Sequence, residues 1–188
     1  MIDNIEVIES QIRQLLAAVV WTHKIQEKQA DIYKERNIRL EIIKIFLSAI
    51  TTSGICAVVF INQYSLKIIT AIISVISLFI NFYYKTYDLK ELQKKHKKSA
   101  IDLLELREEI IGVLCDIKIG KYDEQSLISK RNEILEKQMR IYKDCLDASS
   151  KAVNRASANL KIRQDNTYSD DEIDSYLPIL ARKNNRTI

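Results

Sequence analysis

The sequence has 188 residues, a formal net charge of +4 and three cysteines, with only three glycines and one proline. So few turn-forming residues argue against a sheet-rich fold and predict an all-α protein with few, long helices. The small charge and the scattered cysteines give no support to nucleic-acid binding, a disulfide framework or a metal site, so no nucleic-acid partner and no cofactor are expected.

Residues 1–41 are expected to form an amphipathic helix that continues into the next segment. Apolar residues recur there at intervals of three and four, the spacing of one helix face. They are Ile5, Ile8, Ile12, Leu15 and Val19, with Leu16, Val20 and Trp21 beside them. We expect Trp21 to pack in a core rather than to form a binding platform.

Residues 42–84 contain two apolar segments, 42–61 and 66–84, each long enough to cross the core of a bilayer. The short connection between them forces an antiparallel transmembrane hairpin. Lysines and arginines flank its open end, so the positive-inside rule predicts both termini in the cytoplasm. The alternative is a soluble bundle in which the flanking helices bury the hairpin.

A polar stripe follows one face of the second apolar segment, with members three or four residues apart: Lys67, Thr70, Ser74, Ser77 and Asn81. The first segment has a shorter version: Lys44, Ser48, Thr51 and Thr52. Two interpretations are open. Small and hydroxylated side chains let membrane helices pack closely. Alternatively, the stripe lines a water-filled pore when several hairpins assemble, with Lys67 and Lys44 at its two mouths.

Residues 85–165 are expected to form two long helices that pack on the first as an elongated bundle or coiled-coil stalk. The first of the two carries an apolar rhythm with two polar interruptions: Leu89, Leu92, His96, Ser99, Leu103, Leu106, Ile110, Val113 and Ile117. Leu103 and Ile110 are predicted to set its packing. His96 is interpreted as a buried, hydrogen-bonded histidine, with a register-setting contact and a pH sensor as alternatives.

A break is expected near Gly120, where Asp123 or Ser126 caps the next helix. That helix is predicted to run without interruption to about Arg163, with Leu135 and Met139 in its heptad seams. The tail, residues 166–188, contains a short amphipathic piece and is expected either to be disordered or to dock on a neighbouring subunit or on lipid.

Four lysines follow the hairpin closely: Lys94, Lys95, Lys97 and Lys98. Two hypotheses fit them, contact with anionic lipid head groups or binding of an anionic nucleotide messenger. No glycine-rich phosphate loop, nucleophile elbow or paired-carboxylate motif is found in the sequence, so no enzymatic activity is expected.

The order of an N-terminal helix with a tryptophan, a tight membrane hairpin and long helices behind it resembles the SLATT family, the SMODS and SLOG-associating two-transmembrane effector domains of bacterial conflict systems. The stretch from Leu15 to His23 looks like that family's helix before the membrane. Four residues after the hairpin look like those of the family's next helix: Tyr87, Glu91, His96 and Arg107. The stretch from Leu177 to Arg182 is similar to a C-terminal element in some members.

The resemblance implies a membrane effector in the bacterial inner membrane. Such an effector oligomerises into a pore, or disrupts the bilayer, when an upstream sensor detects infection. The partners that the resemblance implies are the lipid bilayer, further copies of the chain, and a nucleotide second messenger or a sensor protein of the defence system. The alternative function is a membrane-anchored helical scaffold that recruits a cytoplasmic partner.

Overall fold

The computed structural model describes residues 4–61, 63–163 and 169–178, and no strand is present within these ranges. The all-α prediction is confirmed. The elements in chain order are α1 (Asn4–Phe60), α2 (Tyr64–Thr86), α3 (Leu89–Lys118), α4 (Glu124–Asp144), α5 (Ser150–Ala158), a π-helical turn (Asn159–Arg163) and α6 (Asp170–Tyr176).

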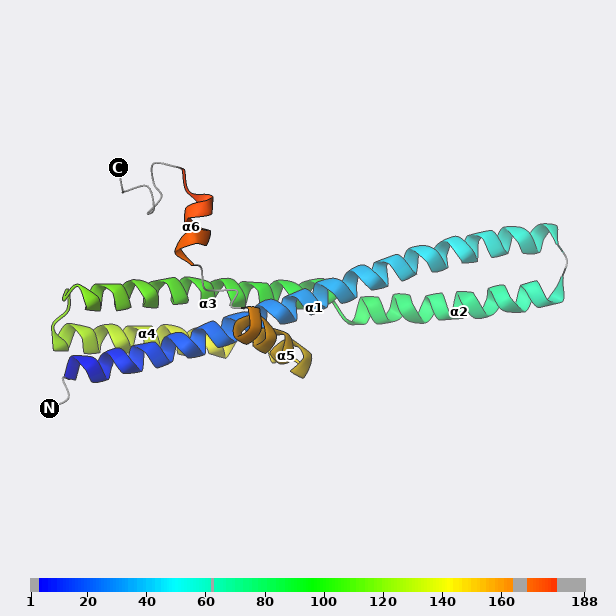
Figure 1. The fold of residues 1–188 in the computed structure, drawn as a ribbon. Coiled ribbons are helices and arrows are strands. Elements are labelled where there is room, and N and C mark those ends of the chain that lie inside the picture. Colours follow the sequence, from blue (N-terminus) through cyan, green and yellow to red (C-terminus); the bar gives the residue numbers. More distant parts are fainter. Residues whose placement is uncertain (1–3, 62, 164–168, 179–188) are drawn as a thin grey trace.

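Helix α1 is the axis of the molecule. Its 57 residues make it about 85 Å long, and it runs without a break from a helical bundle into an apolar hairpin (Figure 1). In the bundle it lies beside α3 and α4, whereas in the hairpin it is paired with α2 (Figure 1). The expected continuation of the first helix into the membrane segment is therefore confirmed.

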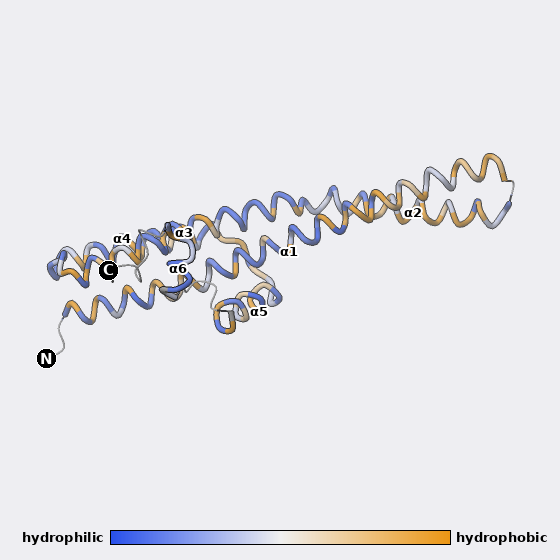
Figure 2. Tube along the Cα trace, turned by 45° about the horizontal axis from the view of Figure 1, so that its top comes forward, coloured by the Kyte–Doolittle hydropathy of each residue, from blue (hydrophilic) through white to orange (hydrophobic). Residues whose placement is uncertain are grey.

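Within the described residues, the rest of the chain does not bury the apolar segments of the hairpin. Two helical stretches are long and apolar enough to cross a membrane, and none of the apolar window in α1 is buried by the rest of the chain. Large side chains such as Phe46, Leu78 and Phe79 are 65–70% exposed, and hydrophobic residues colour both arms of the hairpin (Figure 2). The soluble-bundle alternative is wrong, because the flanking helices leave the hairpin uncovered.

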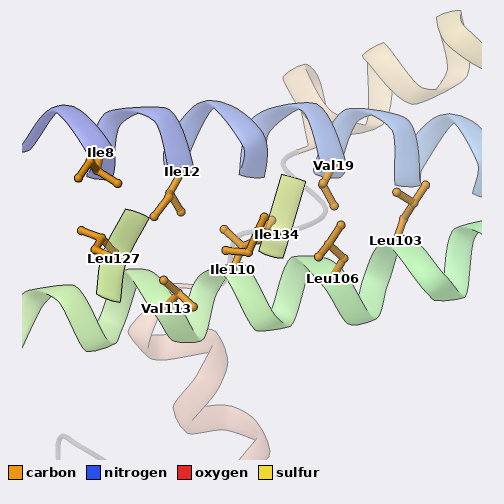
Figure 3. Packing of buried hydrophobic residues seen from close by; sticks show 9 residues of the cluster. All are labelled: Ile8, Ile12, Val19, Leu103, Leu106, Ile110, Val113, Leu127 and Ile134. Atoms are coloured by element: carbon orange, nitrogen blue, oxygen red, sulfur yellow. The ribbon is translucent and has the colours of Figure 1, made fainter. Parts of the chain in front are cut away.

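The bundle is held by one apolar seam between α1, α3 and α4 (Figure 3). The buried side chains are Ile8, Ile12 and Val19 of α1, Leu103, Leu106, Ile110 and Val113 of α3, and Leu127 and Ile134 of α4. Leu103, Ile110 and His96 are at most 1% exposed, while Trp21 is half-buried. The rhythm of threes and fours in α3 therefore marks the face that packs.

The turn between α3 and α4 forms as the sequence suggests. Gly120 has φ +71°, in the left-handed region that glycine occupies without a steric penalty. The Asp123 carboxylate then accepts a hydrogen bond from the Ser126 backbone amide at 2.8 Å and caps α4.

The expectation of one uninterrupted returning helix is wrong. Helix α4 ends at Asp144 and α5 begins at Ser150. The expected heptad seam is also displaced, because Leu135 and Met139 are 42% and 50% exposed while their neighbours Ile134 and Gln138 are buried. The reason for the break is a set of side chains from α1 that bind the backbone of residues 145–149.

The amphipathic piece predicted in the tail is helical. Ser169 and Glu172 form a reciprocal capping box at the start of α6. The rest of the tail, residues 166–168 and 179–188, lies outside the described residues, as does Asn62 in the hairpin connection.

Candidate functional site

The two arms of the hairpin come close together at Gly54. A Cβ atom at this position would lie 2.8 Å from the Thr70 Oγ1 atom and 3.1 Å from its Cγ2 atom. A shallow groove beside this contact is lined by small and aliphatic residues of both arms, among them Ala49, Ser53 and Ala57. Small residues that let helix backbones approach are typical of packed membrane helices.

The contact predicts a stability effect that a second substitution should reverse. Gly54→Ala is expected to destabilise the hairpin by about 1–3 kcal/mol, because the added methyl group overlaps Thr70. Adding Thr70→Ala removes the two atoms in conflict and should restore most of the loss. SDS titration in mixed micelles measures both effects.

Gly112 supplies the matched control, since a Cβ there would meet nothing within 4 Å. Gly112→Ala is expected to be neutral or stabilising by up to about 1 kcal/mol through helix propensity. A Gly54→Ala protein as stable as the parent would show that the arms do not pack in this register.

The predicted polar stripe is divided by the fold. Thr70, Ser74 and Ser77 are half-buried in the middle of α2, whereas Lys67 and Asn81 at its ends are exposed. The Ser74 hydroxyl donates to the Thr70 carbonyl at 2.8 Å, an intrahelical bond that needs no partner helix. The pore-lining role of the stripe stays a prediction.

The shorter stripe of α1 is divided in the same way. Lys44 and Thr51 are half-buried, and Ser48 is exposed. The Lys44 ammonium lies 4.1 Å from the centre of the Tyr84 ring of α2, a cation–π contact. The Thr51 Oγ1 atom is buried without a hydrogen-bond partner among the described residues.

A polar cluster joins the arms at the open end of the hairpin. The Glu41 carboxylate accepts a hydrogen bond from the Tyr84 hydroxyl at 3.1 Å and pairs with the Lys90 ammonium at 2.8 Å. Hydrogen bonds from Lys90 and then Tyr84 lower the pKa of Glu41. Arg36 also donates to the Tyr83 hydroxyl. Tyrosines at this level fit the interface between hydrocarbon and water.

Between the apolar seam and the open end of the hairpin lies a polar layer, called here the glutamine layer. It is formed by Gln26 and Gln29 of α1 with His96 of α3. The His96 Nδ1 atom lies 2.5 Å from the Gln26 Oε1 atom, and the Tyr33 ring stacks on the imidazole at 5.4 Å between ring centres. Burial lowers the pKa of His96, so the neutral ring is favoured. The expectation of a buried histidine with satisfied hydrogen bonds is met only at Nδ1, because the Nε2 atom is buried without a partner among the described residues.

The glutamine layer also holds the break between α4 and α5. The Gln26 amide donates to the Leu146 carbonyl at 3.0 Å. The Gln29 Oε1 atom accepts from the Ser149 amide at 2.9 Å and from its hydroxyl at 2.7 Å. These bonds satisfy backbone groups that a continuous helix would have paired internally, so the break is stabilised from outside.

Sequence reasoning missed Gln26 and Gln29, although a signal for Gln26 exists. The spacing of three and four that marks the seam of α1 continues past Val19 through polar and small residues: His23, Gln26, Ala30, Tyr33 and Asn37. All of these except Tyr33 are buried. A polar residue in register with an apolar face indicates a buried hydrogen-bonding layer.

Ion pairs fix the shorter helices against the long ones. Arg155 of α5 donates two hydrogen bonds to the Glu35 carboxylate of α1, at 2.8 and 3.0 Å. Between α3 and α4, Glu109 lies within 3.0 Å of the Lys130 and Lys137 ammonium groups. The same two lysines lower the pKa of Glu133 to about 2.

No group of three or more histidine, cysteine, aspartate or glutamate side chains that could hold a metal ion is found in the described part of the chain. Comparison with known families gave a match. The sequence model described as SMODS and SLOG-associating 2TM effector domain family 4 matches residues 8–172, which takes in the bundle, the hairpin and the first turn of α6. Neither the curated proteins nor the solved structures gave a match.

Proposed function

The chain belongs to family 4 of the SMODS and SLOG-associating two-transmembrane effector domains, and from this membership we propose that its copies assemble in the bacterial inner membrane and permeabilise it. Membership makes the protein a membrane effector of defence systems. The proposal adds oligomerisation, a pore or a local disruption of the bilayer, and a trigger from an upstream sensor. The protein then acts without a catalytic step of its own.

The observation that carries the proposal is the position of Asn81. Its side chain is exposed on a helix that is long and apolar enough to cross a membrane. Asn81 precedes the interfacial Tyr84 by three residues, about 4.5 Å along the helix. An amide without a partner at this edge of the hydrocarbon is costly, and the other arm of the hairpin does not cover it. Another copy of the chain, or water between copies, would satisfy it.

The proposed topology places the bundle and both termini in the cytoplasm. Basic residues gather at the open end of the hairpin, among them Arg36, Arg39, Lys85 and Lys90, as the positive-inside rule requires. In this orientation the bundle faces the cytoplasm, where a sensor protein or a nucleotide second messenger would reach it.

Ion leakage from liposomes tests the proposal. Asn81→Leu is expected to reduce leakage by about tenfold or more, because the pore loses its amide while the helix remains apolar enough to insert. Phe79→Leu is the matched control, since Phe79 is 70% exposed on the same helix and its replacement keeps an apolar surface. Mass measurement in detergent shows whether each variant still assembles. Equal leakage from Asn81→Leu and the parent would refute the pore assignment.

A scaffold is the second candidate, and the half-buried middle of the stripe favours it. Thr70 lies against Gly54 of α1 in a single chain, and Ser77 is half-buried, as expected if the stripe serves helix packing. The hairpin would then be an anchor, and the bundle would recruit a cytoplasmic partner. Exchanging residues 42–84 for an unrelated hairpin should preserve function in a scaffold and abolish it in a pore.

A further inference from the structure

A basic cleft lies on the side of the bundle, between α1 and α3. Its volume is about 290 Å³. Its charged and polar lining comes from both helices: His23 and Glu27 of α1, and Lys97 and Arg107 of α3. Ile101 and Leu104 of α3 form an apolar part of the wall and are 45% and 36% exposed.

The two cations of the cleft are not neutralised within it. Lys97 takes part in none of the ion pairs between described residues, and the Arg107 guanidinium bonds to Glu108, its own neighbour on the helix surface. The cleft's carboxylate, Glu27, is occupied elsewhere, because Lys24 and Lys28 pair with it at 3.2 and 3.4 Å. Among the described residues, Lys97 is therefore the unpaired cation of the cleft, whereas Arg107 reaches a ligand only by exchanging its bonds to Glu108.

His23 also lines the cleft, and one of its ring nitrogens has no hydrogen-bond partner among the described residues. His23 is 8% exposed, and its Nδ1 atom is buried without a hydrogen bond among the described residues. Burial lowers the pKa of His23, and the positive charges of Arg107, Lys24 and Lys97 lower it further, against the opposing effect of Glu27. A buried polar atom without a partner is rare, because it loses its hydrogen bond to water on folding.

We propose that this cleft binds a soluble phosphate-bearing anion, with Lys97 and Arg107 as its charged contacts and His23 in the wall behind them. Lys97 and Arg107 are ten residues apart on one helix, a separation of about 15 Å between backbones. Both side chains line the same cleft, and Ile101 and Leu104 offer an apolar surface to the rest of the ligand. Arginine and lysine are the side chains that proteins use for phosphate.

The position of the cleft argues against a lipid head group as the source of the phosphate. His23 precedes Ile42, the first residue of the apolar segment, by 19 residues, which is about 28 Å along a helix. The four lysines after the hairpin differ in whether they line this cleft. Lys97 lines the cleft, whereas Lys94, Lys95 and Lys98 do not. The inference goes beyond membrane permeabilisation, and binding is measurable without any assay of leakage.

Calorimetry on the full chain in nanodiscs of zwitterionic lipid tests the site, with inorganic pyrophosphate and adenosine diphosphate as probes at physiological ionic strength. The parent protein is expected to bind at least one probe saturably at concentrations up to the millimolar range. Lys97→Gln and Arg107→Gln should each weaken binding by about tenfold. Lys94→Gln, an exposed lysine of the same helix outside the cleft, should leave the affinity within about twofold.

Two results would overturn the proposal. One is the absence of saturable binding to both probes by the parent protein. The other is an equal loss in the Lys94→Gln variant, which would mean that the general positive charge of α3 attracts the probe. Circular dichroism of each variant controls for folding, and Lys97→Arg, which keeps the charge, should retain binding.

Discussion

Replacing Ile110 with alanine is expected to lower the free energy of unfolding of the bundle by about 2–5 kcal/mol. Ile110 is fully buried in the seam between α1, α3 and α4 (Figure 3), and truncation leaves a cavity that the three helices can close only in part. The sequence has one tryptophan, Trp21, and it lies in the bundle rather than in the hairpin. Urea unfolding followed by its fluorescence therefore reports on the bundle.

The next residue of the same helix is the matched control for this substitution. Ile111 is 38% exposed, so Ile111→Ala removes the same atoms from a surface that water already reaches. Its expected cost is below about 1 kcal/mol. A loss at Ile111 as large as that at Ile110 would contradict the packing described for α3.

Replacing Gln26 with leucine is expected to lower the free energy of unfolding by about 1–3 kcal/mol for each buried group that loses its hydrogen-bond partner. The substitution leaves the His96 Nδ1 atom and the Leu146 carbonyl without their hydrogen bonds. Because the second group belongs to the break between α4 and α5, amide hydrogen exchange should rise in residues 145–149 before it rises in α3. Urea unfolding and hydrogen exchange measure the two effects.

Two further variants make the test specific. Gln14→Leu, at an exposed position of α1, should leave both readouts near those of the parent. Adding His96→Leu to Gln26→Leu should recover part of the stability, because both members of the buried pair become apolar. If Gln26→Leu were as stable as the parent, with unchanged exchange at residues 145–149, the glutamine layer would have no role in holding the break.

Several features of this protein follow from the sequence by itself, because they depend on periodicity within one segment. The length of the two apolar segments and their short connection predict the hairpin. The seam from Leu89 to Ile117 predicts the buried face of α3, since burial repeats with the helical turn. Gly120 and Asp123 predict the turn before α4 from local backbone preferences.

Other features were decided by tertiary structure, because they depend on which distant residues meet. The heptad pattern of residues 123–163 is compatible with a continuous helix, yet Gln26 and Gln29 bind its backbone and stabilise a break after Asp144. The polar stripe of α2 is a single face in sequence, but the approach of Gly54 to Thr70 turns its middle toward α1 and leaves Asn81 exposed.

The basic cleft depends on the same kind of information. Nothing local distinguishes Lys97 from the three lysines beside it, and only the packing of α1 on α3 places it near His23 and Arg107. Hydrogen bonds and charge clusters between segments leave no periodic pattern in the sequence, so they cannot be predicted from it. The sequence determined the helices and their apolar faces, which do repeat with the helical turn. Packing decided which polar groups those faces bring together.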